Sequence, residues 1–225
     1  MAREVLTKEQ IVRTAIELLD EDGLDGLNMR ALGKRLGAVP TAVYWHVSNK
    51  DKLMVLAGDE VWNEIALPAP DPDDWRTPAV GLATELYAML MRHPWLVPAF
   101  GSYLFYGPGK ARYDDRCLAV YEAGGFAGPD ADRAAAAVFT FVFGNALGAS
   151  AMMSLTRRLS RNGGDADALI QETLTKATEV AMQFPQLRTR LTSPAAEYNA
   201  APAQTFEHGL RALLDGLEAS RASNR

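Results

Sequence analysis

The stretch NMRALGKRLGAVPTAVYWHVSNKDK, residues 28–52, constrains the fold more than any other part of the chain. Its first half has apolar residues at helical spacing, among them Leu32 and Leu36, and cations on the opposite face. Gly37 stands where a helix needs a left-handed stop, and Pro40 has the fixed φ that suits the first turn of a second helix. The sequence therefore predicts two short helices joined by a tight turn, which is typical of a helix-turn-helix DNA-binding unit.

The second short helix is predicted from Pro40 to Val47. Val43 and Val47 are four residues apart and face inward, whereas most of the other side chains turn outward. The outward-facing residues are Thr41, Ala42, Tyr44, Trp45 and His46. Exposed aromatic side chains on so short a helix are costly unless something covers them. We therefore expect a partner molecule to cover this surface.

The same stretch is positively charged in an acidic protein. Residues 28–52 contain five cations and one aspartate, a local net charge of +4, although the chain of 225 residues has a formal charge of −5. The cations are Arg30, Lys34, Arg35, Lys50 and Lys52. Ser48 and Asp51 predict a capping box for a third helix, with Lys50 in its first turn, where a lysine opposes the helix dipole. A local positive field of this kind is expected of a site that neutralises phosphates.

The segment LGAVPTAVYWHVSNKDKL resembles the recognition-helix signature of the tetracycline-repressor (TetR) family. The usual form of that signature is LGV, a few small or polar residues, and then LYxHFxxKxxL. The residues that match it are Leu36, Gly37, Tyr44, His46, Val47, Lys50 and Leu53. The resemblance covers about residues 7 to 60 and implies that the second short helix enters the major groove.

The resemblance also implies which side chains contact DNA. Base-edge contacts are implied for Arg30, Pro40, Thr41 and Trp45, and phosphate contacts for Tyr44, His46 and Lys50. Two positions depart from the family. Val39 stands where a serine cap is common, and Ala42, which we assign to the same DNA-binding surface, stands where a hydroxyl often binds phosphate. Thr41 is placed to replace that hydroxyl. The alternative interpretation is a packed three-helix unit with a solvated basic face.

The rest of the chain is also helical in pattern, so the predicted fold class is all-α: an N-terminal three-helix helix-turn-helix DNA-binding domain plus a larger helical ligand-binding and dimerisation domain. A helix from a Thr7–Gln10 capping box to Gly23 braces the DNA-binding unit. We divide the chain into a DNA-binding head (1–52), a connector helix (53–66) and a helical body (67–225). The helices expected in the body cover residues 80–91, 113–123, 130–159, 166–184 and 202–219, and a glycine-bearing loop covers residues 101–109.

Two of these helices predict a homodimer. The helix at 130–159 is apolar nearly all round and must be covered on every side, and the helix at 202–219 has a broad apolar stripe near the terminus. In the resembled family the matching helices form a four-helix bundle across a twofold axis, which presents two recognition helices to two half-sites. The alternative is that both stripes form core within one chain.

No apolar run approaches the ~18 residues of a membrane span, and no secretion signal begins the chain, so we expect a cytoplasmic protein without membrane contact. The single cysteine, Cys117, is expected to be a buried helix residue.

The body has many aromatic and methionine side chains, which suit either a core or an adaptable apolar pocket. The candidate ligand-binding residues are Trp62, Tyr87, Met91, Trp95, Phe100, Tyr103, Phe105, Phe139, Phe143 and Asn145. Asn145 is chosen because an amide on an apolar helix needs a hydrogen-bond partner. The resemblance implies that a ligand in this body moves the connector helix and spreads the recognition helices apart. The metal-tetracycline pocket is not expected, because the region after His93 offers no second histidine there.

An enzyme is not expected. His46, His93 and His208 stand in three separate contexts, and the chain has no HExxH, GxSxG or GxxxxGK[ST] motif, so we expect no catalytic residues, no metal and no cofactor. The sequence predicts a ligand-responsive transcriptional regulator, a homodimeric repressor that binds a palindromic operator on double-stranded DNA and is released by a small hydrophobic or aromatic effector. The alternatives are a ligand-binding or scaffold protein with a vestigial DNA-binding head and, third, an enzyme.

Overall fold

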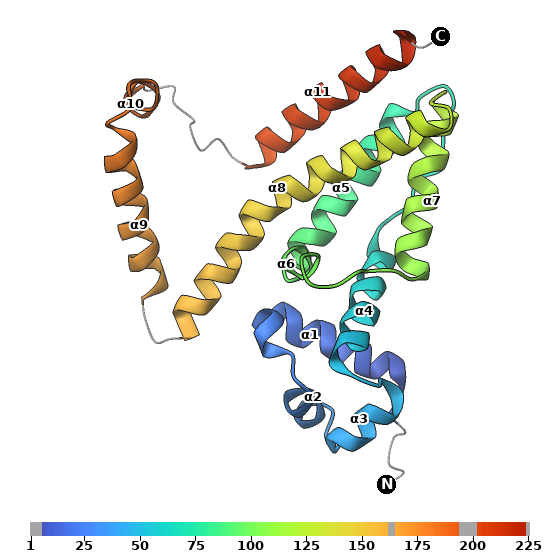
Figure 1. Cartoon of the computed structure of the whole chain (residues 1–225), viewed down its shortest axis with the longest axis vertical. Helices are drawn as coiled ribbons and strands as arrows, with labels where there is room; N and C mark the ends of the chain where they lie inside the picture. Colours follow the sequence, from blue (N-terminus) through green and yellow to red (C-terminus); the bar gives the residue numbers. More distant parts are fainter. Residues whose placement is uncertain (1–5, 162–164, 194–201, 224–225) are drawn as a thin grey trace.

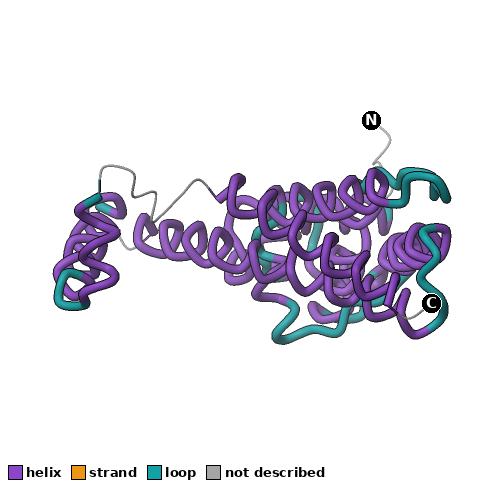
Figure 2. Tube along the Cα trace, turned by 90° about the horizontal axis from the view of Figure 1, so that it is seen from above, coloured by secondary structure: helices purple, strands orange, loops and turns teal. Residues whose placement is uncertain are grey.

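The computed structural model describes residues 6–161, 165–193 and 202–223. These residues form helices and no strand, which confirms the all-α fold class. In Figure 1 the N-terminal helices form a head at the bottom of the view, and one long helix crosses the larger body above it. Figures 1 and 2 both show α9 and α10 standing apart from the rest of the body.

The head consists of α1 (Lys8–Gly26), α2 (Met29–Arg35), α3 (Pro40–His46) and the first turns of α4 (Lys50–Val61). The Thr7–Gln10 capping box is present at the start of α1, as predicted. Gly23 interrupts the helix where its end was predicted, with a non-helical φ of 69°, and a short helical piece beyond this kink extends α1 to Gly26.

The start of α4 differs from the prediction. Its N-cap is Asn49, whose side-chain oxygen accepts a hydrogen bond from the backbone N–H of Lys52 at 2.7 Å, so the Ser48–Asp51 capping box is wrong by one residue. Asparagine and serine cap helices about equally well, so composition alone does not separate the two registers. The connector ends as a single 3₁₀ turn, η1 (Trp62–Glu64).

The body is arranged around one helix, α8 (Pro129–Arg161), against which most of the others pack. The other helices are α5 (Arg76–Arg92), α6 (Leu96–Ala99), α7 (Pro108–Ala123), α9 (Ala166–Ala181), α10 (Pro185–Thr192) and α11 (Pro202–Ser223). Two of these helices, α6 and α10, were not expected from the sequence; both are short and begin close to prolines. A single hydrophobic cluster runs from the head into the body, and α4 joins its two parts through Met54, Ala57 and Val61.

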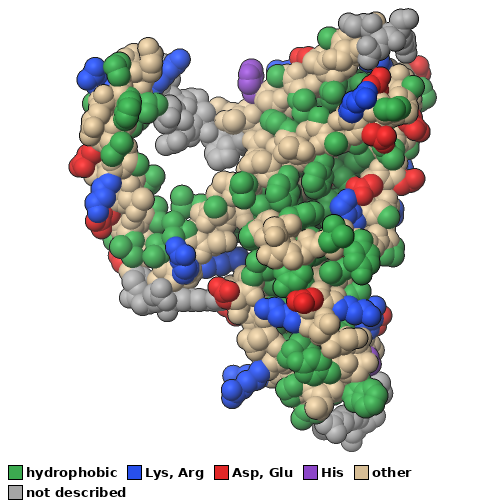
Figure 3. All heavy atoms as spheres, in the orientation of Figure 1, with side chains coloured by type: hydrophobic (Ala, Val, Ile, Leu, Met, Phe, Trp, Pro, Cys, Tyr) green, Lys and Arg blue, Asp and Glu red, His purple; other side chains and the backbone are tan. Residues whose placement is uncertain are grey.

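The helix α8 is apolar nearly all round, as expected, but the expectation that no apolar run approaches the length of a membrane span is wrong. Over Pro129–Ser160 its length and composition would allow it to cross a membrane, with a mean hydropathy of 1.5 and 22% of the window buried. The core helix of a soluble protein passes the same test. One face of α8 packs against α5, α6, α7 and α11, whereas Leu147, Met152 and Met153 are exposed. Figure 3 shows hydrophobic side chains gathered along this side of the body. Much of the apolar surface of α8 is therefore exposed to solvent in the single chain.

Candidate DNA-binding surface and effector pocket

The turn between α2 and α3 is held by two glycines. Gly37 has a φ of 61°, the left-handed conformation predicted for it. At Gly33 a Cβ would lie 2.8 Å from the carbonyl oxygen of Ala38, so only glycine lets the turn come this close to α2. Val43 and Val47 are fully buried, which fixes the rotation of α3 and turns its other side chains outward.

The exposed face of α3 carries most of the predicted DNA-binding residues. Trp45 is 89% exposed and Tyr44 is 47% exposed, so two large rings stand in solvent on a helix of two turns. The other exposed members of the set are Arg30, Pro40, Thr41 and His46, and the half-buried ones are Ala42 and Lys50. Beside α3 a groove of about 890 Å³ is lined in part by Arg13, Arg35 and Ala42. The exposed face of α3 is therefore aromatic, and the groove beside it shares Ala42 with that face.

One of the five cations of residues 28–52, Arg35, forms an ion pair within the head. The guanidinium of Arg35 donates hydrogen bonds to both carboxylate oxygens of Glu21, each at 2.5 Å, and so ties α2 to α1. The hydrogen bond with Glu21 raises the pKa of Arg35, and the same interaction lowers the pKa of Glu21. The positive field of the head therefore depends on the other four cations of residues 28–52.

Six of the candidate ligand residues meet in one aromatic cluster in the body. Phe100 lies 5.0 Å from Phe105 and 5.1 Å from Phe143, measured between ring centroids. Phe139 links this group to Trp62 at 6.4 Å. The cluster consists of Trp62, Phe100, Tyr103, Phe105, Phe139 and Phe143, contributed by η1, the 101–107 loop and α8, with Phe100 at the end of α6.

The other four candidates are not in this cluster. Tyr87 stacks on Phe206 of α11 with centroids 4.5 Å apart, so it belongs to the α5–α11 seam. Trp95 donates its indole N–H to Asp20 of α1 at 2.7 Å. Met91 is partly buried against the core. Asn145 donates to the carbonyl oxygen of Phe141, one turn earlier on α8, at 2.8 Å, so its amide already has a local partner.

The loop between α6 and α7 follows α4 along its length. The carboxylate of Asp59 accepts hydrogen bonds from the backbone N–H groups of Gly109, at 3.3 Å, and Lys110, at 2.9 Å. This long-range cap explains why α7 begins at Pro108 and not at Tyr113 as predicted. The ring of Phe105 lies on Gly58, where a Cβ would come within 2.2 Å of it. A movement of this loop therefore changes its contacts with α4.

The wall formed by α7 and α8 contains a cavity of about 330 Å³. Its lining is apolar with a few polar groups: Lys110, Tyr113, Asp114, Cys117, Leu118, Asp132, Ala135, Ala136, Phe139 and Thr140. The ammonium of Lys110 lies 5.7 Å from the centre of the Phe139 ring, within reach of a cation–π contact. Cys117 is buried as predicted, and burial raises the pKa of its thiol to about 11, so the thiol stays protonated and unreactive near neutral pH.

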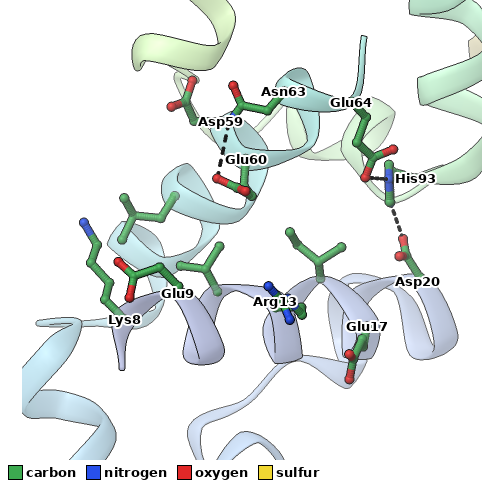
Figure 4. A pocket seen from close by; sticks show the side chains of 13 residues that line it. Lys8, Glu9, Arg13, Glu17, Asp20, Asp59, Glu60, Asn63, Glu64 and His93 are labelled. Carbon is green, nitrogen blue, oxygen red and sulfur yellow. Dashed lines mark hydrogen bonds and ion pairs between the residues drawn. The ribbon is translucent and has the colours of Figure 1, made fainter. Parts of the chain in front are cut away.

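Another groove, of about 700 Å³, lies at the joint between head and body. It is acidic, with Glu9, Glu17, Asp20, Asp59, Glu60 and Glu64 facing Lys8 and Arg13. Figure 4 shows His93 at one end of this groove, between Glu64 and Asp20. The described residues contain no group of three or more acidic, histidine or cysteine side chains arranged to hold a metal ion.

His93 clamps the head to the body. Its Nδ1 lies 2.8 Å from Asp20 Oδ1 on α1, and its Nε2 lies 2.9 Å from Glu64 Oε1 on η1. Carboxylates only accept, so both contacts are satisfied together when both ring nitrogens carry a proton. Burial by itself lowers the pKa of His93, but the hydrogen bonds and charges of Asp20 and Glu64 outweigh it and the pKa is raised. This clamp was not expected from the sequence, which placed His93 only at a helix end.

Comparison with known proteins finds one family over most of the chain. The family model for bacterial regulatory proteins of the tetR family matches residues 11–56, and the model for the tetracycline-repressor-like C-terminal domain matches residues 67–221. An HTH-type transcriptional regulator of Saccharopolyspora erythraea is 31% identical over 218 residues, which cover 97% of this chain and 87% of that protein. The class C tetracycline repressor protein of Escherichia coli is 28% identical over 225 residues, covering 96% and 92%.

Solved structures give the same result for the fold. The apo structure of ActR from Streptomyces coelicolor matches with a TM-score of 0.77 and 27% identity over 100% of both chains. The structure of ActR in complex with actinorhodin matches with a TM-score of 0.76 and 29% identity, covering 97% of this chain and 98% of that one.

Proposed function

The chain belongs to the tetracycline-repressor family of bacterial transcriptional regulators, and we propose that it is a homodimeric repressor released from a palindromic operator by a small aromatic effector. The observation that carries this proposal is the exposed face of α3. Trp45 is 89% exposed on a helix of two turns, and so large an exposed ring is costly unless a partner covers it. This favours a working head over a vestigial one.

For the DNA contacts we propose the roles that the family resemblance implies. Arg30, Pro40, Thr41 and Trp45 contact base edges, Tyr44, His46 and Lys50 contact phosphates, and Ala42 lies against the DNA between them. Six of these residues are exposed on α2 and α3 and two, Ala42 and Lys50, are half-buried beside them, which supports these roles. Lys50 is well suited to phosphate because it stands at the N-terminal end of α4, where backbone N–H groups also favour an anion.

The proposed dimer forms through the helices at 130–159 and 202–219. In α11 the apolar residues Phe206, Leu210 and Leu214 are already buried within one chain, where α11 packs on α8, so only other faces of α11 are open to a second copy. The exposed Leu147, Met152 and Met153 on α8 support this, because apolar side chains along a helix that is already half packed fit a second copy of the same helix. The exposed Leu174 and Phe184 near α9 and α10, which stand apart from their own body, could be covered in the same way. A second copy would then cover the apolar face of α8 without a membrane, in keeping with a cytoplasmic regulator.

The effector is proposed to bind among the aromatic side chains of the body. The cluster around Phe139 and Phe143 touches both α4 and the loop that follows it. We therefore propose three functional parts: a DNA-binding head (1–52), a connector (53–66) and a ligand-binding and dimerisation body (67–225). We propose that the loop and the connector have two arrangements, and that an effector which binds one of them better shifts the position of the head. A coupling free energy of about 1 to 3 kcal/mol between effector and operator binding changes operator affinity about 5- to 150-fold.

The test is to titrate the purified protein against a pool of random DNA duplexes and to sequence the duplexes it retains. We expect an enriched palindrome whose half-site centres are about 10 base pairs, one helical turn, or a multiple of that distance apart. The absence of any enriched sequence would favour a ligand-binding or scaffold protein instead.

A further inference from the structure

One imidazole ring joins the head, the connector and the body. His93 is the C-cap of α5 in the body and is only 6% exposed. Its Nδ1 lies 2.8 Å from Oδ1 of Asp20 on α1, and its Nε2 lies 2.9 Å from Oε1 of Glu64 on η1. Figure 4 shows the ring between these two carboxylates. The two distances are typical of charge-assisted hydrogen bonds, so the ring ties α1 and the end of the connector to the body.

The two contacts exist together only while the ring carries two protons. A neutral imidazole has one N–H donor, and its other nitrogen is an acceptor. A carboxylate only accepts, so after deprotonation one ring nitrogen of His93 faces a carboxylate oxygen with no proton between them. Loss of the proton therefore replaces one of the two hydrogen bonds by a repulsion between lone pairs. Histidine is the side chain that most readily loses its proton near neutral pH.

Each carboxylate of the clamp has a second partner from the body. Oδ1 of Asp20 also accepts a hydrogen bond from the indole N–H of Trp95, at 2.7 Å. Oε2 of Glu64 accepts one from Nε of Arg92, at 3.0 Å. Because these two contacts do not depend on the proton of His93, its loss loosens the joint and does not open it. We therefore expect an effect of about one hydrogen bond.

The charged groups near the ring are mostly acidic. They are Arg13 and Glu17 of α1, Asp59 and Glu60 of α4, Lys8 and Glu9 at the far end of the same groove, and Asp22, Asp25, Arg157 and Arg158 in a separate cleft beside Trp95. Burial by itself lowers the pKa of His93, but Asp20 and Glu64 outweigh burial and the pKa is raised. The clamp is therefore charged at low pH and loses its charge as the pH rises.

Each end of the clamp leads to an element of the DNA-binding surface. Glu21 follows Asp20 on α1 and accepts both hydrogen bonds from Arg35 of α2. Glu64 belongs to η1, which directly continues α4, the helix whose first turn carries Lys50. The clamp thus holds both helices relative to the body. In the proposed dimer it also holds the two copies of α3 at the separation that two operator half-sites require.

We propose that His93 is a positioning residue for operator binding, and that the loss of its proton weakens that binding. This inference rests on the proposed function and adds regulation by pH to it. A head that is already held in place loses less conformational freedom when it binds DNA, so the protonated form binds more tightly. By linkage, the bound operator makes the proton of His93 harder to remove.

The test compares the wild type with His93→Gln in fluorescence anisotropy titrations of the selected operator. The titrations run from about pH 6 to about pH 8.5 at constant ionic strength, across the range in which histidines titrate. Glutamine, like a neutral imidazole, has one donor group and one acceptor, and it does not titrate. The dissociation constant of His93→Gln should exceed that of the wild type about 2- to 12-fold for each half-site at the lowest pH, the effect of one hydrogen bond. The ratio should fall to about 1 at the highest pH.

Two controls separate this role from a DNA contact and from a general effect of histidine loss. His93→Gln should keep the salt slope of the wild type, because His93 contacts no phosphate in the proposed complex. His46, the proposed phosphate contact, titrates in both proteins, so its contribution cancels in the ratio. His208→Gln is the matched control, since His208 is exposed on α11, and it should match the wild type at every pH.

A second measurement needs no substitution at His93. The protein has three histidines, and ¹³C labelling at Cε1 gives three imidazole signals, of which His46→Gln and His208→Gln identify the other two. In the wild type the midpoint of the His93 titration should lie at a higher pH with the operator than without it. A ratio of dissociation constants that does not change with pH would give His93 a merely structural role and overturn the inference, and so would a midpoint that the operator leaves unmoved or lowers. Either result with an enriched palindrome would contradict this inference alone, whereas the absence of any enriched duplex would contradict the repressor proposal and this inference with it.

Discussion

The head and the body differ in how much of their apolar surface one chain covers. In the head Ile11, Leu32 and Val43 are fully buried, and the exposed large side chains lie on and beside α3. In the body Leu147 of α8 is 53% exposed and Phe184 is 55% exposed, far from the head. Exposed apolar surface of this extent marks an interaction site. This difference supports the proposals that DNA covers the exposed face of the head and that a second copy of the chain covers the exposed apolar surface of the body.

The largest predicted effect comes from a charge placed on the uncovered face of the body. Leu147→Arg should leave the melting temperature of a lone chain almost unchanged, because surface substitutions usually alter stability by within about 0.5 kcal/mol. It should nevertheless split the dimer and weaken operator binding by about 10²- to 10⁴-fold, the range for losing a linked second contact. Size-exclusion chromatography with light scattering and DNA titration measure both effects.

The control for Leu147→Arg is Ala111→Arg at an exposed position of α7. It should remain dimeric and bind the operator normally. If Leu147→Arg also remains dimeric, the contrast between a complete head and an incomplete body fails.

The second prediction tests the joint between the two regions. His93→Gln removes a charge-assisted bridge, and hydrogen bonds to charged groups are worth about 1.5 to 3 kcal/mol each. Because the folded-state pKa of His93 is raised, its contribution to stability is complete below the unfolded value of about 6.5 and is lost as the pH rises through the folded value. Urea unfolding measured from pH 5.5 to pH 9 should show this decline in the wild type and a flatter profile in His93→Gln.

The comparison variant is His208→Gln, since His208 is exposed on α11. It should keep the wild-type profile. A His93→Gln profile that parallels the wild type would mean that the Asp20–His93–Glu64 bridge does not titrate in this range.

The third prediction concerns a base contact made by the head. Arg30→Ala should cost about 1 to 3 kcal/mol of operator affinity and relax the base preference at one position in each half-site. Binding measured against a set of single-base operator variants tests this. An equal loss on every variant would make Arg30 a phosphate contact.

The smallest prediction concerns a phosphate contact. Lys50→Ala should weaken binding to all duplexes alike and reduce the magnitude of the salt slope by about 1, because one phosphate contact releases about one counterion. Titrations at four or more salt concentrations give the slope. Lys176→Ala, on the exposed α9 outside the head, should leave the slope unchanged, and a loss at Lys50 confined to one base position would contradict the phosphate role.

The sequence predicted what depends on neighbouring residues. The Thr7–Gln10 cap, the left-handed Gly37 and the inward Val43 and Val47 all follow from spacings of a few residues, and the structure confirms them. The register of the α4 cap was missed by one residue, because Ser48 and Asn49 are both good caps.

The features that were missed depend on distant residues. Asp20 is 73 residues from His93 in the chain and Glu64 is 29, so no local spacing marks the clamp. Asp59 caps α7 from about 50 residues away. The aromatic composition of the body predicted a core or an apolar pocket, but it could not separate Trp62, whose N–H is unpaired, from Trp95, whose N–H is bonded.

The most direct test is sedimentation equilibrium of the full-length protein at micromolar concentration, alone and with its selected operator duplex. If the body is complete only as a pair, the free protein has twice the 24.5 kDa mass of one chain, and each duplex binds two chains. A free mass of 24.5 kDa together with one chain bound per duplex would contradict it.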